Sequence, residues 1–557
     1  MADAQARSML SVFLDQVIQA DFLGVNATYH GFAFMPEQTA RGMSDAERQL
    51  EFERVSRLGL NIARTWYRPD WAYGDSLANI VDWNSEKMTA FYRWLDAMKT
   101  RNVDVALQAG WWFTRDTYYG SPVPVPARDI DLYTRWVSES LHQIITARGF
   151  DNVRYLMLFT EPTSYESGIV PQDETQWSYY VKVVKALHQR LLVAGQRSLV
   201  RLVGPNNAFQ GVHLAEAVAE LDGVIDIYSG HDYNQPGYAE WFSVCQAMQQ
   251  KVTPTGKPFW LDEYGLQNET QRQQPDYGNY LAQAVAASLN AGNQSSFLWL
   301  LFDQQYVSND ASSVQTVTNT DSFYGGVHRW GVWKWPYDTL ELPQQPYPHW
   351  YAFSLLSRYL GGRSGSRTLA AQGSAGVVAA ATRPAGGELT ILLVNITTQE
   401  QPVEVHFDRP LNRTLYRFMY VPDDIHVDPS GQMIGYNRVD ERVQDSFTDE
   451  LPAHAVVLYT TLVGTAGQPP ITPLWLHAAW SSYGHAVLTW MDRSKNESGL
   501  RIERLSLETG EASAFIVPTG TREYTDDTAQ PGSGYAYRVC AFNNDGRSGW
   551  VYAELRF

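Results

Sequence analysis

The 557-residue sequence has only two cysteines, Cys245 and Cys540. They fall in segments assigned below to different domains, so we expect neither a disulfide between them nor a metal site built from them. No stretch reaches the roughly 18 apolar residues of a membrane span, and the N-terminus lacks the pattern of a signal peptide. We therefore expect no membrane contact, and a cytoplasmic location for the chain as given or an extracellular one if a signal was removed.

Positive charge is also scarce. The chain has 43 Lys and Arg against 60 Asp and Glu, which gives a formal net charge of −17. Binding to a phosphate backbone needs a basic face, and no long run of Lys or Arg supplies one, so nucleic acid is not expected as a partner. Aromatic residues are abundant at 13%, with 19 Trp and 32 Tyr. Their flat faces suit the C–H faces of sugars, although for any single Trp a place in the core is the more common role.

The first 360 residues or so contain one repeating unit, a short apolar run followed by a helix-like stretch. Strand followed by helix, eight times over, predicts a parallel sheet closed into a (β/α)8 barrel. An open doubly wound sheet is the alternative, but no glycine-rich phosphate loop follows the first run. The eight runs cover residues 22–27, 60–66, 103–110, 153–159, 199–204, 224–230, 258–265 and 295–302.

Two of the intervening stretches carry helix boundaries. In "MSDAERQLEFERVSRLG", Ser44 can cap a helix and Glu47 stands three residues later, which is the spacing of a capping box. The stretch "WSYYVKVVKALHQRLLVAG" ends at Gly195, a residue that favours helix termination. These signals support helices between the apolar runs.

The chain changes character after residue 362. Residues 363–463 contain alternating strand-like runs that predict an antiparallel β-sandwich, and the Gly/Pro-rich residues 464–473 predict a linker. Residues 474–557, with "HAVLTWMD" and "YAYRVCAFNNDGRSGW", resemble a fibronectin type III module, and we place no chemistry there. The predicted fold is of the α/β class, a (β/α)8 TIM barrel over residues 1–362 followed by two all-β sandwich domains.

Two of the apolar runs end in a glutamate. "RYLMLFTEPTSYESG" delivers Glu161 after the fourth run, and "KPFWLDEYG" delivers Glu263 after the seventh. The C-terminal ends of barrel strands meet at one mouth, so these carboxylates face each other there. Two carboxyl groups placed across such a mouth can together hydrolyse a glycosidic bond. Pro162 is expected to restrict Glu161 to extended backbone geometry and so to aim its side chain.

At these residues the sequence resembles clan A of the retaining glycoside hydrolases, over roughly residues 15–360. In that clan the acid/base follows strand four in an Asn-Glu-Pro motif and the nucleophile follows strand seven. The resemblance implies that Glu161 is the acid/base and Glu263 the nucleophile, with no metal and no cofactor. Thr160 stands where the clan has its usual Asn, a residue that commonly binds the sugar 2-hydroxyl.

Other strand ends match the clan as well. Arg64 is similar to the arginine that lies beside the nucleophile, although it could instead pair with Asp70 or Asp262. A positive charge there would keep Glu263 ionised.

The remaining candidates are substrate-binding residues. His231 and Tyr233, in "SGHDYN", are similar to a pair that the clan often has, in which the tyrosine donates to the nucleophile. Trp299 resembles the tryptophan that forms the floor under the sugar. Trp111 and Trp112 follow the third run and are expected at the wall of the substrate cleft, although one of two consecutive side chains can point into the core.

A long segment over residues 303–338 follows the eighth run. It is polar at first and then carries Trp330, Trp333 and Trp335. A segment of this length is too long for a mere connection, so we interpret it as a loop that folds over the barrel mouth.

Together these features predict a retaining glycoside hydrolase that acts on an oligosaccharide or polysaccharide by double displacement. The sequence leaves open the sugar, the linkage, exo or endo action, and the oligomeric state. A barrel that binds carbohydrate without catalysis is the alternative, which the presence of both glutamates disfavours. A metal-dependent hydrolase would need clusters of His and Asp at strand ends, and only "GHDY" offers one.

Overall fold

The structure is a computed structural model of the whole chain. It describes residues 7–556 except for 35–43, 69, 74–80, 111–116, 119–120, 123–129, 164–173, 306–326, 335–344, 364, 386, 426–433, 435, 462–469, 495–496, 498 and 544–545. Trp111, Trp112 and Trp335 fall outside the described residues, as does most of the segment expected over the barrel mouth.

Eight parallel strands close into a barrel in which neighbours in space follow one another in sequence. Each predicted run contains or overlaps one of them, so the barrel prediction is confirmed. The strands, in order around the barrel, are β2 (Val25–Thr28), β3 (Ile62–Tyr67), β4 (Asp104–Ala109), β7 (Val153–Leu158), β8 (Arg201–Asn207), β9 (Ile227–Tyr233), β10 (Phe259–Gly265) and β11 (Ser295–Leu298).

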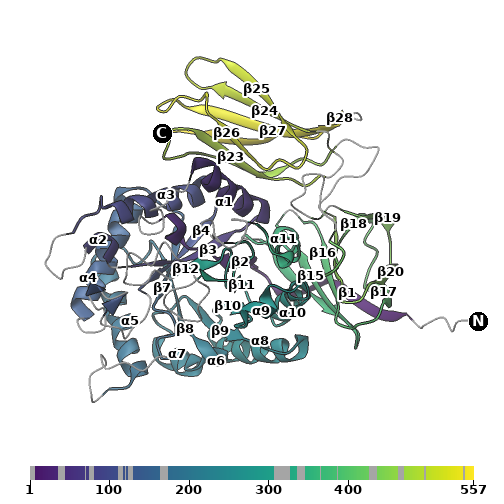
Figure 1. Cartoon of the computed structure of the whole chain (residues 1–557), viewed down its shortest axis with the longest axis horizontal. Coiled ribbons are helices and arrows are strands. Elements are labelled where there is room, and N and C mark those ends of the chain that lie inside the picture. The colour runs from purple at the N-terminus through teal and green to yellow at the C-terminus, as the bar shows by residue number, and fades with distance from the viewer. Residues whose placement is uncertain are drawn as a thin grey trace, which may run out of the picture.

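Helices surround the barrel (Figure 1). The predicted capping box of Ser44 and Glu47 is present at the start of the first long helix, which ends at Gly59 with φ of 65°. Among the helices that the structure describes, none is long and apolar enough to cross a membrane. They are α1 (Asp45–Leu58), α2 (Asp70–Tyr73), α3 (Glu86–Thr100), α4 (Ile130–Leu141), α5 (Gln176–Val193), α6 (Ala208–Gly211), α7 (Leu214–Leu221), α8 (Tyr238–Val252), α9 (Glu269–Arg272), α10 (Tyr277–Asn290) and α11 (Pro348–Tyr359). The chain also forms 3-10 turns at Gly31–Phe34 and Thr253–Thr255 and a π-helical segment at His142–Ala147.

Apolar side chains fill the barrel interior. A cluster of buried residues, one or two from each strand or the residues just before it, includes Ile62, Met157, Ile227 and Trp260. Above this layer, towards the C-terminal strand ends, the buried residues become polar. Apolar side chains therefore fill the barrel interior at this layer, and polar side chains line its mouth.

A nine-stranded sheet follows the barrel in the order β19-β18-β21-β16-β15-β14-β1-β17-β20. Its edge strands β19 and β20 are consecutive in sequence and separated only by residues 444–445, so the sheet must curl round on itself. The strands are β1 (Ser8–Gln19), β14 (Arg367–Gln372), β15 (Val377–Arg383), β16 (Thr390–Asn395), β17 (Gln401–Phe407), β18 (Arg413–Tyr420), β19 (Arg438–Val443), β20 (Ser446–Leu451) and β21 (Val456–Thr460).

The N-terminal strand of this sheet was not expected there. The predicted range 1–362 assigned Ser8–Gln19 to the barrel, whereas the structure pairs it antiparallel with β14 and parallel with β17. The expected antiparallel sheet therefore contains one parallel pair. Leu10, Val12 and Leu14 alternate along the strand and pack into the core of the sheet. The partner strands of these apolar residues lie far along the chain, so no local hairpin pattern in the sequence predicts the pairing.

The C-terminal module consists of two sheets with one hydrophobic core. The module lies over α1 and α3 (Figure 1). Its strands are β22 (Leu474–Trp480), β23 (Ala486–Met491) and β26 (Glu523–Asp526) in one sheet, and β24 (Gly499–Ser506), β25 (Ala512–Pro518), β27 (Tyr535–Asn543), β28 (Gly546–Arg547) and β29 (Val551–Leu555) in the other. Two pairs of two-residue strands complete the described strands, β5 (Thr117–Tyr118) with β6 (Ser121–Pro122) and β12 (Gln304–Gln305) with β13 (Val327–His328).

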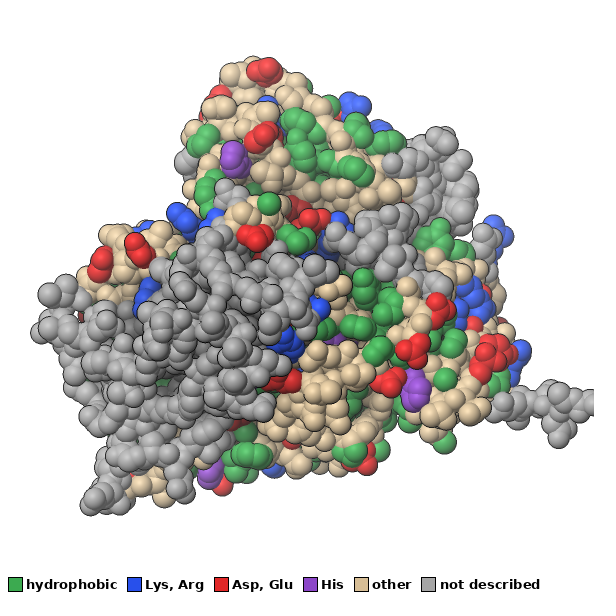
Figure 2. Space-filling model, in the orientation of Figure 1, with side chains coloured by type: hydrophobic (Ala, Val, Ile, Leu, Met, Phe, Trp, Pro, Cys, Tyr) green, Lys and Arg blue, Asp and Glu red, His purple; other side chains and the backbone are tan. Residues whose placement is uncertain are grey.

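Charged contacts join this module to the barrel. Acidic and basic side chains lie next to each other where the module meets the rest of the molecule (Figure 2). Arg101, just after α3, forms an ion pair of 2.5 Å with Glu523, and both side chains are buried. Glu523 also accepts hydrogen bonds from Ser56 and Gln49 of α1. The module beyond the linker is thus docked against the barrel.

The Arg101–Glu523 pair gives a prediction for stability. Replacing Glu523 with Ala removes the carboxylate and leaves the Arg101 guanidinium buried beside it, which costs about 3 kcal/mol of the free energy of unfolding. The double variant Arg101→Met/Glu523→Ala should lose less, because no buried charge is left without its partner. Denaturant unfolding of the full chain measures both, and a double variant less stable than Glu523→Ala would contradict this account.

Candidate active site

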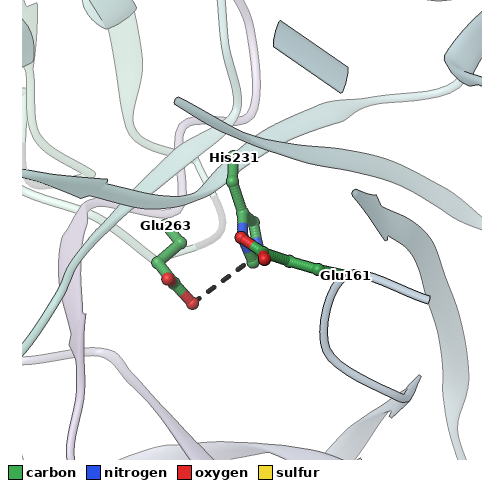
Figure 3. Close-up of side chains that lie close together, drawn as sticks. All are labelled: Glu161, His231 and Glu263. Atoms are coloured by element: carbon green, nitrogen blue, oxygen red, sulfur yellow. Dashed lines mark hydrogen bonds and ion pairs between the residues drawn. The ribbon is translucent and has the colours of Figure 1, made fainter. Parts of the chain in front are cut away.

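Glu161 and Glu263 converge at the mouth of the barrel. Glu263 lies in β10, and Glu161 lies three residues after the end of β7. A carboxyl oxygen of each lies within 4.8 Å of the other and of a ring nitrogen of His231. The three side chains point toward one another from three different strand ends (Figure 3). Both carboxyl groups are largely buried, with side chains 14% and 7% exposed respectively.

An irregularity in β10 explains why two consecutive acidic residues face the same site. Leu261 pairs with Gly230 and Glu263 pairs with His231, so Asp262 is an extra residue in the pairing of β10 with β9. Such a bulge interrupts the strict alternation of side chains along a strand. Asp262 and Glu263 consequently both approach Nε2 of His231, at 3.5 and 3.7 Å.

The backbone at Glu161 is not extended, contrary to the expectation from Pro162. Glu161 has φ of 46° and Phe159 has φ of 56°, in the left-handed region. The amide of Glu161 donates to the carbonyl oxygen of Asn206 in β8, at 3.0 Å. This bond turns the chain inward where β7 ends, an arrangement that the rule for residues before proline did not foresee. A non-glycine residue in this region costs about 1–3 kcal/mol, and such residues cluster at functional sites.

Glu263 is held by two donors. Nη1 of Arg64 donates to one carboxyl oxygen, and the hydroxyl of Tyr233 donates to the other. Burial alone would raise the pKa of Glu263, but His231, Arg64 and the Tyr233 hydrogen bond outweigh it and hold the pKa below its usual range. Burial and the Glu263 carboxylate raise the pKa of Tyr233 well above its usual value, so the phenol stays a donor.

His231 connects the acidic residues of the site. Its Nδ1 lies 3.1 Å from Oε1 of Glu161, and the ring is fully buried. Burial would lower the pKa of His231, but Glu263, Asp262 and the hydrogen bond to Glu161 outweigh burial and Arg64, so the pKa is raised. Burial also raises the pKa of Asp262 above its usual range, despite His231 and Arg64.

A chain of hydrogen bonds runs from Arg64 to Thr160. Nε and Nη2 of Arg64 both donate to Oε1 of Gln108, at 3.0 and 2.7 Å. The amide nitrogen of Gln108 then donates to Oγ1 of Thr160, which also accepts from Nε1 of Trp66 at 3.0 Å. Both lone pairs of the Thr160 hydroxyl are thereby used, so Thr160 can act toward a ligand only as a donor.

Aromatic rings pack beside these polar groups. Trp299 follows β11 and lies 5.0 Å from Trp66 between ring centroids. His30 stacks on Trp66 at 4.2 Å, and Trp330 lies 6.2 Å from Trp299. Trp333, expected in the loop over the mouth, is instead fully buried in the core and donates to Glu51 of α1. It contributes to packing and not to the barrel mouth.

Sequence reasoning missed three residues of the site, namely Gln108, Trp66 and His30, and named Asp262 only as a possible partner of Arg64. Gln108 had a readable signal, since it is a polar residue near the C-terminal end of the otherwise apolar "VALQA" of β4. Trp66 stands two residues after Arg64 in β3, the spacing that puts two side chains on one face of a strand. The bulge that turns Asp262 inward has no such signal in the sequence.

Glu161, His231 and Glu263 are also spaced to hold a metal ion. Among the described residues they form the one such group of three or more. The carboxyl oxygens of Glu263, however, already accept from Arg64 and Tyr233, and the Arg64 guanidinium would repel a cation bound there. The donor set therefore fits a metal poorly.

Comparisons with known proteins bear on the fold. No protein-family model and no curated protein matches the sequence. The structure is similar to a GH30 endoxylanase from Clostridium papyrosolvens C71, with a TM-score of 0.53 and 13% identity over 82% of this chain and 100% of that chain. It is also similar to a GH39 β-xylosidase from Caulobacter crescentus, with a TM-score of 0.54 and 15% identity over 82% of this chain and 100% of that chain.

A third solved structure to which this one is similar is named as a glucosidase. A glucosidase from Croceicoccus marinus has a TM-score of 0.55 and 13% identity, over 82% of this chain and 98% of that chain. At these identities the likeness shows a fold shared with glycoside hydrolases.

The charged groups around His231 predict that its pKa is raised. Its ring should titrate above the ordinary value of about 6.5. Its contribution to stability should then be fully present below that unfolded-state pKa and be lost as pH rises through the raised folded-state pKa. NMR of protein labelled at histidine nitrogens measures the midpoint, and the His231→Gln variant assigns the resonance by its loss. A midpoint at or below about 6.5 would contradict the charge distribution described here.

Proposed function

We propose that the chain is a retaining glycoside hydrolase that cleaves a glycosidic bond of an oligosaccharide or polysaccharide by double displacement. Glu263 is the nucleophile and Glu161 is the acid/base. The observation that carries the proposal is how closely the two carboxyl groups approach, because one oxygen of each lies within 4.8 Å of the other. Retaining enzymes have carboxyl groups about 5–5.5 Å apart, whereas inverting enzymes leave about 6.5–9.5 Å for a water molecule.

The environment of Glu263 supports the first step. Arg64 and Tyr233 favour its ionised form, so a carboxylate oxygen can attack the anomeric carbon. Glu161 donates its proton to the leaving oxygen as the glycosidic bond breaks. The first product leaves with that proton, and the sugar is now joined to Glu263 through an ester bond.

The second step uses the same residues in reverse roles. Glu161, now a carboxylate, takes a proton from water, and the water oxygen attacks the anomeric carbon. The ester bond breaks, and Glu263 leaves as the carboxylate that Arg64 and Tyr233 stabilise. Two inversions return the original configuration. His231, at 3.1 Å from Glu161, is a positioning residue for this proton transfer.

The neighbours in structure support the substrate class. Two of them are named as a xylanase and a xylosidase, and a third as a glucosidase. For this chain we propose Arg64, Thr160, His231, Tyr233 and Trp299 around the sugar, with Trp299 as the apolar surface beneath it. Thr160 would donate one hydrogen bond to a sugar hydroxyl oxygen, whereas the amide of the usual Asn can both donate and accept.

The division of labour between the glutamates is tested with variants. Glu263→Ala should lose hydrolysis of every aryl glycoside, and added azide should restore turnover through a glycosyl azide of inverted configuration. Glu161→Ala should spare substrates with good leaving groups, slow those with poor ones by about 10²–10⁴-fold, and give an azide product of retained configuration. Kinetics over a panel of aryl glycosides, with NMR of the azide products, measures both.

Controls separate this proposal from its alternatives. Glu216→Ala, on the surface helix α7, should behave as the wild type. Glycan binding without hydrolysis of any aryl glycoside in the panel would favour a binding barrel instead. Loss of wild-type turnover on adding a chelator, with recovery on adding a divalent cation, would favour a metal-dependent hydrolase at the same three residues.

Gln108 supplies a second prediction for the reaction. Gln108→Leu leaves Nε and Nη2 of Arg64 buried without their acceptor, which costs about 1–3 kcal/mol of stability. Arg64 is then no longer held beside Glu263, so kcat/KM should fall about tenfold or more. Gln108→Glu keeps an acceptor for Arg64 but draws its charge away from Glu263, so it should reduce kcat as well and raise the pH at which Glu263 ionises. Unchanged kinetics in Gln108→Leu, with the fold verified by circular dichroism, would show that Arg64 needs no such support.

A further inference from the structure

A second site lies at the opposite end of the barrel. A pocket of ≈ 60 Å³, partly open to solvent, lies between the barrel and the C-terminal module. Its barrel wall comes from the C-terminal ends of α1, α3 and α11 and from the residues just before β3 and β4. Its module wall comes from β22, β23 and the residue before β26. Because β3 and β4 begin here, the cavity lies at the end of the barrel away from Glu161 and Glu263.

The lining of this cavity is strongly basic. Arg101, Arg358, Arg363 and Arg522 contribute to it, and none of the described residues that line it is acidic. Arg101, Arg358 and Arg522 are each no more than 7% exposed. Four arginines thus line one small pocket in a chain whose net charge is −17.

The carboxylates next to Arg101 and Arg522 differ in how close they lie. Glu523 pairs with Arg101 at 2.5 Å. Oδ2 of Asp492 lies 3.8 Å from Arg522 and 4.0 Å from Arg358, distances at the limit of an ion pair. Among the described residues, the ion pair of Arg522 is therefore only this long contact, and a buried charge without a close counter-charge is costly.

The fourth arginine has no carboxylate in contact among the described residues. Asp104 acts on Arg363 from a distance but forms its own ion pair with Arg154, at 3.0 Å. Arg363 instead stacks over the ring of Trp475 in the module, 5.2 Å from its centroid. Burial lowers the pKa of Arg363, although part of its side chain stays accessible to water.

Several donors of these arginines are also unused. Nε of Arg101, Nε of Arg363, and Nε and Nη2 of Arg522 are buried and make no hydrogen bond to any described residue. Buried donors of this kind ordinarily have an acceptor. The donors come from the barrel and from the module, so one acceptor between them would contact both.

We propose that this cavity binds a small tetrahedral oxyanion, phosphate or sulfate, that fastens the C-terminal module to the barrel. Guanidinium groups match the oxygens of such ions in pairs, and a tetrahedral ion offers oxygens in several directions at once. Arg363 and Arg101 hold it from the barrel side, and Arg522 holds it from the module. The site is separate from the proposed active site and does not depend on the proposed hydrolysis.

The test measures phosphate binding to the full chain. Isothermal titration calorimetry should show saturable binding with one phosphate per chain, and sulfate should compete for the same site. Phosphate should also raise the midpoint of thermal unfolding above that in chloride of equal ionic strength. Acetate, which is planar and carries one charge, should bind at least about tenfold more weakly. Equal binding of acetate would overturn the assignment of a tetrahedral ion.

Variants connect the binding to the named residues. Arg522→Met and Arg363→Met should each weaken phosphate binding at least about tenfold, while the matched control Arg556→Met, at an exposed arginine of the same module, should bind as the wild type. Arg363 is half-buried, so its variant tests the site even if Arg522→Met fails to fold. No saturable binding to the wild type would overturn the proposal. So would an equal stabilisation of all variants by phosphate, because that is the general effect of a salt excluded from protein surfaces.

Discussion

The buried contact between Arg64 and Glu263 is the interaction on which the proposed active site depends. It joins β3 to β10 across the barrel, between two side chains that are almost inaccessible to water. Taking two such charges out of water is unfavourable unless further hydrogen bonds satisfy them. Gln108 provides these for Arg64, and Tyr233 provides one for Glu263. The other polar groups of the site, among them Thr160, His231 and Asp262, lie around this pair.

Much of the fold could be predicted from the sequence because the relevant signals are local. Each of the eight barrel strands contains or overlaps a short apolar run, as expected for strands covered on both faces, and parallel strands place their C-terminal ends at one mouth. That rule alone brings Glu161 and Glu263 together. The helix start at Ser44 was readable for the same reason, since both members of its capping box lie within four residues.

The parts that could not be predicted depend on the backbone or on distant residues. One extra residue in the pairing of β10 directs Asp262 to His231, and no residue type marks that position. The left-handed backbone at Glu161 follows from a hydrogen bond to Asn206 in the next strand, which outweighs the local preference of a residue before proline. Gln108 was readable as a polar residue in an apolar strand, but its partners were not.

The pairing of β1 with β14 and β17 has a consequence for how the chain reaches this structure. The amide of Leu14 donates to Asp408, a residue 394 positions later. During synthesis from the N-terminus, the first strand leaves the ribosome before either of the strands on its two sides exists. Its apolar residues must stay unpaired while the whole barrel is made, and contacts of such long sequence separation form slowly. The sheet is therefore completed late, and closing it ties the start of the chain to the segment beyond the barrel.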